Sequence, residues 1–463
     1  MPRVARLSAL LLAASAAAGQ SPPFVSSEEA RPVLTAMREA LPAGLAGRTD
    51  EDLAAAWPGW VLEHDRAVRD RLVRGEEDAL VNLLLFGTSF TKAPRLTSAA
   101  LAGSPAPEAE KALTQRLQDL VGALVAPGRD ERLVLSRSLL DRLGQPVGAP
   151  GGRERVTSWL RENVARVRRE QTAFAAELQK VRALPDATEQ LAARSTLFRE
   201  RGIALDTSLR PAFALDEALR DALDRGLLTA GSVRRVAVVG PGLDFVDKAE
   251  GQDFYPPQSL QALALADSLV RLGIAKPEAL SISAFDISPR VLDHLERAKA
   301  RALDGEAYVV QLPRPLEGWA APFVAYWRRL GDAVAGPALA AKPPPSAGLV
   351  EVRAVRVRPE VVALVHSADL NVVYQRLDLP AGERFDLVVA TNILVYYDTF
   401  EQCLALANIA RMTAVGGLFL SNSSVLELPD SRLRSVGYKT VVFSDRPDDG
   451  EHVIFYRRLP DPR

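Results

Sequence analysis

The chain has 463 residues, enough for one to three domains, and its 48% hydrophobic and 25% charged residues are ordinary for a globular protein. A net charge of −1 gives no reason to expect a nucleic acid or an anionic membrane as partner. A single cysteine, Cys403, excludes an intrachain disulfide and the cysteine zinc spacings. Four histidines without an HExxH arrangement argue against a zinc enzyme, so we expect no metal centre.

The first residues have the layout of a secretory signal peptide. Arg3 and Arg6 give a positive start, residues 7–18 are apolar, and small residues precede Gly19. The run is shorter than the ~20 apolar residues of a spanning helix. We expect residues 1–19 to be cleaved and the protein to be exported, periplasmic or secreted, without a transmembrane segment. The alternative is a cytoplasmic protein with an alanine-rich leader or a misplaced start codon.

Apolar residues at helical spacing dominate the next part of the chain, where strand signals are scarce. They predict an α-helical domain over residues 20–229, whose role the sequence does not give. The predicted helices are residues 53–73, 76–85, 111–125, 131–143 and 153–181.

Strands and helices alternate over residues 230–463, which predicts a mainly parallel α/β sheet with covered faces. Two final strands around a turn at 446–450 predict a C-terminal antiparallel hairpin. We expect a loop at 333–348 because alanine and proline are frequent there. The predicted strands and extended segments are residues 236–239, 280–285, 308–312, 350–358, 372–377, 387–390, 418–421, 440–444 and 452–456. The predicted helices are residues 260–272, 289–302 and 400–413.

Two glycines follow the first strand, in the sequence VAVVGPGLDF at residues 236–245. Glycine lets a backbone turn tightly and approach a ligand closely, so Gly240 and Gly242 are candidate binding residues. A plain strand-to-loop turn is the alternative.

An acid ends the second strand, in ISAFDISP at residues 282–289. Asp286 at such a position can accept hydrogen bonds from both hydroxyls of a ribose, as the corresponding acid of dinucleotide folds does. Pro289 then lies in the first helical turn, which tolerates proline. The alternative is that Asp286 only caps this helix.

The strand at 387–390 ends in a polar pair, in FDLVVATNILVYYD at residues 385–398. Ligands of open α/β sheets bind beyond the carboxyl ends of strands, so Thr391 and Asn392 are candidate site residues. Tyr396 and Tyr397 are candidates for shaping an acceptor pocket, with sheet-to-helix packing as the alternative. Asp398 is the predicted N-cap of the following helix.

These motifs, in this order, resemble the class I S-adenosylmethionine (SAM) methyltransferases over residues 233–458. The CheR type, which methylates glutamates of chemotaxis receptors, is the nearest. The resemblance implies SAM as cofactor, with the glycine loop under its methionine part and Asp286 and Ile287 at its ribose. It also implies that Asp378 and Leu379, in VYQRLDL at residues 373–379, lie beside the adenine.

The chain departs from the CheR type at two places. Thr391 stands where that type has an arginine before the asparagine that Asn392 matches, which puts carboxylate methylation in doubt. The acids that would meet the amino-acid end of the cofactor do not align either. Asp244, Asp247, Glu250 and Asp253 are all open alternatives for that role.

We therefore expect a SAM-dependent methyltransferase that acts on a small-molecule or protein acceptor, with no catalytic residue that the sequence identifies. The polar pair is not the Asn/Asp-Pro-Pro-Tyr motif of enzymes that methylate amino groups of bases, which argues against DNA. The alternative is a catalytically silent exported protein that keeps the fold as a binding or scaffold module.

Overall fold

The computed structural model describes residues 22–96, 107–186, 190, 193, 197–198, 201–246, 252–446 and 448–461. The expected leader, residues 1–19, lies outside them. Within these ranges no helix combines the length and apolar character that crossing a bilayer requires.

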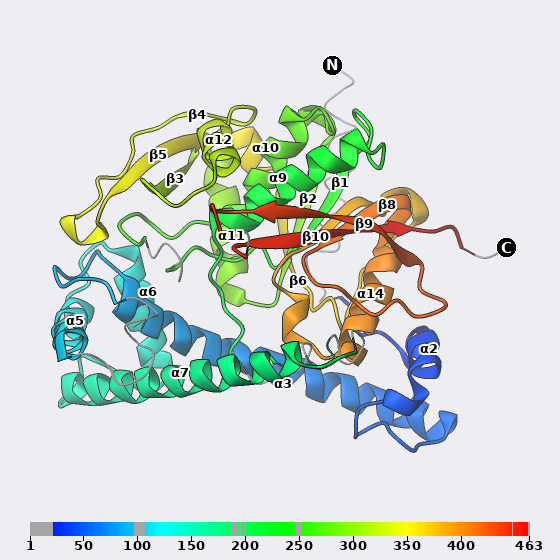
Figure 1. Cartoon of the computed structure of the whole chain (residues 1–463), viewed down its shortest axis with the longest axis horizontal. Helices are drawn as coiled ribbons and strands as arrows, with labels where there is room; N and C mark the ends of the chain where they lie inside the picture. Colours follow the sequence, from blue (N-terminus) through cyan, green and yellow to red (C-terminus); the bar gives the residue numbers. More distant parts are fainter. Residues whose placement is uncertain are drawn as a thin grey trace.

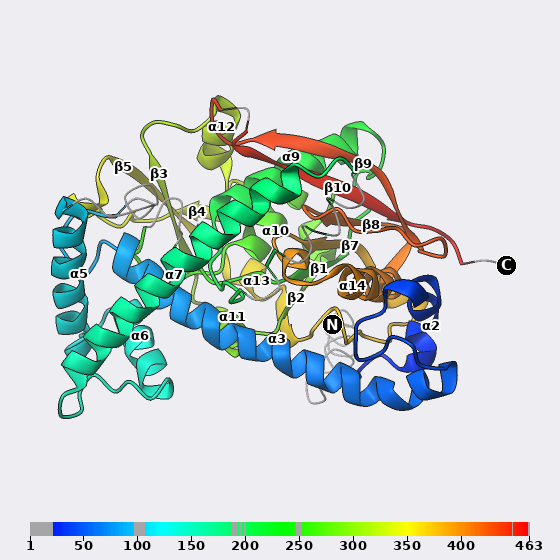
Figure 2. The same cartoon turned by 60° about the horizontal axis from the view of Figure 1, so that its bottom comes forward.

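Long helices form the N-terminal part of the chain, as predicted. They are α2 (Ser27–Ala36), η1 (Arg38–Ala40), α3 (Asp50–Phe86), α5 (Pro107–Val125), α6 (Glu131–Arg142) and α7 (Gly152–Arg182). Residues 53–73 and 76–85, predicted as two helices, belong to the single helix α3, because an interior glycine such as Gly75 costs only about 1 kcal/mol. Helices α3 and α7 pack against each other along one side of the molecule (Figures 1 and 2).

A seven-stranded sheet forms the centre of the C-terminal part. Its strands are β1 (Arg235–Val239), β2 (Ser281–Asp286), β6 (Val365–Asp369), β7 (Phe385–Ala390), β8 (Thr413–Ser421), β9 (Leu433–Val442) and β10 (Gly450–Arg458). Their order is β6-β2-β1-β7-β8-β10-β9. The first five strands in this order pair in parallel, and β10 pairs antiparallel with both β8 and β9. The predicted α/β architecture, a mainly parallel sheet with a C-terminal antiparallel hairpin, is confirmed.

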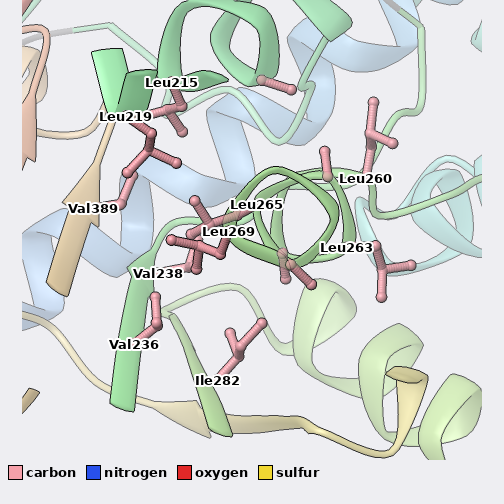
Figure 3. Packing of buried hydrophobic residues seen from close by; sticks show 14 of the residues in the cluster. Leu215, Leu219, Val236, Val238, Leu260, Leu263, Leu265, Leu269, Ile282 and Val389 are labelled. Carbon is pink, nitrogen blue, oxygen red and sulfur yellow. The ribbon is translucent and has the colours of Figure 1, made fainter. Parts of the chain in front are cut away.

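Alternate residues of β1 belong to two different hydrophobic cores, as the period of two in a strand requires. Val236 and Val238 face a core made with α9 (Leu209–Asp224) and α10 (Gln261–Arg271), which Figure 3 shows from close by. Ala237 and Val239 face the other core, which includes residues of α2, α3 and α14 (Thr399–Met412). The remaining helices of this part are η2 (Pro277–Ala279), α11 (Pro289–Leu303), α12 (Ala321–Arg329), η3 (Pro345–Ala347), α13 (Pro359–Val362), η4 (Ala381–Glu383), η5 (Leu394–Tyr396) and α14 (Thr399–Met412).

Helix α9 falls within the residues assigned by sequence to the helical domain, yet it packs on the sheet. The helices and the sheet therefore share cores, and the domain boundary at residues 229 and 230 stays a prediction. The N-cap prediction for α14 is confirmed, because Asp398 and Glu401 form a reciprocal capping box there.

The segment between α11 and β6 carries a second, smaller sheet. Strands β3 (Tyr308–Pro315), β5 (Val350–Val357) and β4 (Ala335–Pro337) form it in the order β3-β5-β4, all antiparallel. The predicted strand at 308–312 thus lies outside the main sheet. Pro313 and Pro315 lack an N–H donor, which is tolerated because β3 is an edge strand. Strand β4 falls inside the predicted loop at 333–348.

The third strand of the parallel part, β6, was not predicted. Its sequence, VHSAD, lacks a continuous apolar run because β6 is the edge of the sheet and remains partly exposed. Residues 372–377 were predicted to be extended, and this prediction is wrong: residues 372–374 form a turn just beyond β6.

Candidate functional site

A cavity of about 220 Å³ lies at the carboxyl ends of β1, β2, β6 and β7, where ligands bind in open α/β sheets. Three of the predicted motifs meet in its lining, although they are far apart in the sequence. The predicted residues that line it are Gly240, Gly242, Asp286, Ile287, Thr391 and Asn392.

Asp378 and Leu379, expected beside the adenine, do not line this cavity. Asp378 is exposed, and Leu379 packs on a hydrophobic core. Residues 370–372 line the cavity in their place. The reason is the unpredicted strand β6: its Asp369 pairs with Asp286 of β2, so the chain directly after β6 lies next to the end of β2.

The glycine turn after β1 has a conformation that favours glycine. Gly240 and Gly242 have φ angles of 68° and 69°, in the left-handed region. A Cβ atom on Gly240 would lie 2.0 Å from Cδ1 of Ile393, and one on Gly242 would lie 3.0 Å from the carbonyl oxygen of Leu205. The turn therefore has no room for a side chain, and Ile393 lies directly against Gly240.

Asp286 lies at the end of β2 and lines the cavity. Burial raises its pKa to about 6, while hydrogen bonds from backbone N–H groups of Ser288, Gly242 and Ile287 favour the charged form. The Ser288 bond is 2.8 Å long. Asp286 thus bonds to Ser288, the N-cap residue that precedes the first turn of α11, and does not itself cap the helix. It also lines the cavity, where it can meet a ligand.

The polar pair after β7 is fixed by hydrogen bonds. Thr391 is buried, and its hydroxyl accepts a bond of 2.6 Å from Nε2 of Gln261. Asn392 has a φ of 60°, the only positive value of a non-glycine residue within the described ranges. Its amide group and backbone N–H pair with the side chain of Asn422 at 2.7 and 2.8 Å, and Asn422 in turn donates to Glu451. Such a strained residue, held by its neighbours at a cavity, is typical of functional sites.

Tyr396 and Tyr397 both line the cavity. The hydroxyl of Tyr396 accepts a bond of 3.2 Å from the N–H of Ala204, and its carbonyl accepts one of 2.8 Å from Arg71. Tyr397 is buried in the core below the sheet, and burial raises the pKa of its phenol. Packing therefore explains Tyr397 fully, and neither phenol is ionised near neutral pH.

Residues 203–208, which we call the covering segment, close the cavity on the side of the helical part. They reach it by crossing α3 at Gly75, where a Cβ atom would lie 1.8 Å from the carbonyl oxygen of Ile203. Leu72 of α3 completes this wall. The covering segment was not predicted. Only the close contact of Gly75 with Gly202 and Ile203 marks it, and these residues are far apart in the chain.

The structure places two of the four acids left open for the amino-acid end of a cofactor. Asp253 accepts hydrogen bonds from the backbone N–H and hydroxyl groups of both Thr88 and Ser89, so it fixes the end of α3. Asp244 lines a second, smaller cavity. The other two acids, Asp247 and Glu250, lie outside the residues that the structure describes.

The lining fits one half of SAM better than the other. A carboxylate, Asp286, and the apolar side chains of Phe285, Leu370 and Val372 suit a ribose and a purine. At the glycine turn, Ile393 takes up the space next to Gly240. The volume of about 220 Å³ is also below the roughly 300 Å³ at which ligand pockets usually begin.

Across the described ranges, no three His, Cys, Asp or Glu residues are placed to hold a metal ion.

Comparison with known proteins gives structural matches alone. No family model matches the sequence, and no curated protein matches it. The glycopeptide N-methyltransferase MtfA, solved with SAM, is 13% identical over 53% of this chain and 67% of its own, with a TM-score of 0.22. A TehB-like SAM-dependent methyltransferase from Corynebacterium glutamicum is 10% identical over 53% and 87%, with a TM-score of 0.22.

A third match, the CMeT domain of the citrinin polyketide synthase, is 12% identical over 96% of this chain and 100% of its own, with a TM-score of 0.27. Such low identities and scores carry no argument about residues, acceptor or activity. They also give no support to the CheR subtype. The chain is structurally similar to class I SAM-dependent methyltransferases.

Proposed function

We propose that this protein is a SAM-dependent methyltransferase acting on a small-molecule or protein acceptor. The observation that carries the proposal is the cavity at the ends of four parallel strands, where a glycine turn, a partly buried carboxylate and apolar walls meet. Methylation of a carboxylate by the CheR route is not part of it, because Thr391 stands where that type has a cation and is bonded to Gln261.

Each part of the lining has a distinct role in the proposal. Asp286 would accept hydrogen bonds from the ribose hydroxyls, and residues 370–372 together with Phe285 would flank the adenine. Ile393 would have to turn away from Gly240 to admit the methionine part, because the two are in contact. Asn392, fixed by Asn422, would lie at the methyl end.

SAM, when bound, supplies an electrophilic methyl group. The protein's contribution to an in-line transfer is then to hold the acceptor in attack geometry and to exclude water, which the covering segment and Tyr396 can do. A carboxylate acceptor needs no base, whereas an amine or a hydroxyl group needs one.

Calorimetric titration with SAM tests the proposal, and the chain offers a matched control. We expect binding by the wild type, its loss in Asp286→Ala, and its retention in Asp378→Ala, since Asp378 is exposed and outside the cavity. Absence of heat with the wild type at millimolar SAM contradicts the proposal. It leaves the silent binding or scaffold module as the function of this fold.

Export remains a second proposal, because the leader lies outside the described residues. It conflicts with a SAM enzyme in one respect, since SAM is made and kept in the cytoplasm. Fusion of residues 1–19 to a periplasmic alkaline phosphatase tests it. We expect an active fusion, and an inactive one places the protein in the cytoplasm.

A further inference from the structure

A second cavity of about 40 Å³ lies next to the first, and the two share Thr207 and Ser208 of the covering segment. Its other walls come from the loop after the glycine turn and from the small sheet, whose β3 contributes Gln311. Trp319, which precedes α12, also lines it. The inserted small sheet thus adds a wall to a space beside the proposed SAM site.

The carboxylate of Asp244 is buried in this cavity without an ion pair to any described residue. The side chain is 7% exposed, and its Oδ2 atom accepts bonds of 2.8 Å from the hydroxyl of Tyr255 and 3.2 Å from Nε2 of Gln258. Its other oxygen, Oδ1, is buried and has no hydrogen-bond partner. A buried carboxylate is costly unless it is paired, so an uncompensated oxygen at a cavity points to a missing donor.

The nearest cation does not supply that donor. Arg132 is buried and directs its Nε and both terminal nitrogens to the backbone carbonyls of Phe245, Asp253 and Asp244. It therefore holds the loop in place and moderates the charge of Asp244 from a distance. The Oδ1 atom of Asp244 therefore stays without a partner among the described residues.

Gln252 lines the same cavity and carries a second buried acceptor. Gln252 is 4% exposed, and its Oε1 atom has no hydrogen-bond partner among the described residues. Two acceptors, one of them charged, complement a group that only donates and carries a positive charge. An ammonium group has three donors and no acceptor, and the aromatic side chain of Trp319 suits a cation as well.

We propose that this second cavity binds the primary ammonium group of a small-molecule methyl acceptor. The inference rests on the proposed methyltransferase function and names the class of its acceptor, an amine-bearing small molecule. The ammonium group has no lone pair, so it anchors the acceptor, and a different group of the same molecule receives the methyl. The volume suits a group of this size, since one water needs only about 10–15 Å³.

Calorimetry with n-butylammonium chloride tests the inference, with n-butanol as the neutral probe of similar shape. We expect the wild type to bind butylammonium and not butanol. Asp244→Asn should weaken butylammonium binding at least tenfold, and Gln252→Leu should weaken it severalfold. Asp378→Asn, which removes an exposed charge elsewhere, should leave binding unchanged. Circular dichroism establishes that each variant is folded.

Equal binding of the two probes, or unchanged butylammonium binding in Asp244→Asn, overturns the inference. A crystal structure with the amine that holds only ordered water beside Asp244 overturns it too. SAM titration of the same preparations separates the two claims. SAM binding without amine binding rejects the ammonium site alone, whereas amine binding without SAM binding rejects its role in holding a methyl acceptor.

Discussion

Replacing Asp244 by asparagine should stabilise the protein at neutral pH. Burial raises the pKa of Asp244 to about 6, against an ordinary value of 3.8, so the folded state binds this proton more tightly than the unfolded state. The stability of the wild type therefore falls as the pH rises from about 4 to about 6, and the loss persists above that range. At about 1.4 kcal/mol per pKa unit, ionised Asp244 costs roughly 3 kcal/mol at pH 7.5.

Asparagine cannot ionise, and its oxygen can still accept from Tyr255 and Gln258. We expect Asp244→Asn to have a free energy of unfolding about 3 kcal/mol higher than the wild type at pH 7.5. The difference should shrink below about 1 kcal/mol at pH 4, where Asp244 is protonated in the folded wild type.

Urea unfolding at both pH values, followed by circular dichroism, measures this difference if the m-values agree. A variant that is less stable than the wild type at pH 7.5 refutes the reasoning, because it means that the carboxylate is stabilised by a partner. A difference that is the same at both pH values also refutes it, since the effect would then not come from ionisation. Arg132, which lowers the pKa, and Asp206, which raises it, are the charged groups that act on Asp244.

Three further changes test how the site is held. Gly240→Ala should lower the free energy of unfolding by about 2 kcal/mol, because its Cβ overlaps Ile393, and adding Ile393→Ala should recover part of that loss in urea unfolding. Asp398→Ala should lower the free energy of unfolding by about 1 kcal/mol in urea unfolding, because it removes the capping box of α14. An unchanged free energy of unfolding would mean that the cap contributes nothing. Asp253→Ala should lower the free energy of unfolding by about 3 kcal/mol and speed amide exchange at residues 88–89, because it removes the acceptor of their N–H groups. Unchanged exchange at these residues would contradict the anchoring role of Asp253.

The sequence predicted those parts of the fold in which local pattern and burial agree. Strand β1 is buried on both faces, so its apolar run was visible, and the glycine turn after it was correctly located. Strand β6 is an edge strand with polar residues and gives no such run. The resemblance put Asp378 and Leu379 beside the adenine; these residues do not line the cavity, whereas residues 370–372, directly after β6, do.

The covering segment and the second cavity were beyond prediction for a different reason. Both depend on contacts between residues that are far apart in the chain, such as Gly75 with Ile203 and Arg132 with the loop after β1. No periodicity or short motif marks such contacts. Asp244 looked like one loop acid among four, and only its burial and its unpaired oxygen distinguish it.

Hydrogen exchange with and without SAM tests the central claim most directly, because it locates the ligand as well as detecting it. We predict slower amide exchange at residues 240–242, 285–287 and 370–372 when SAM is present, and unchanged exchange at 377–379. Exchange that is unaffected by SAM at the ends of β1, β2 and β6, or slowed instead around Asp378 and Leu379, would contradict the account.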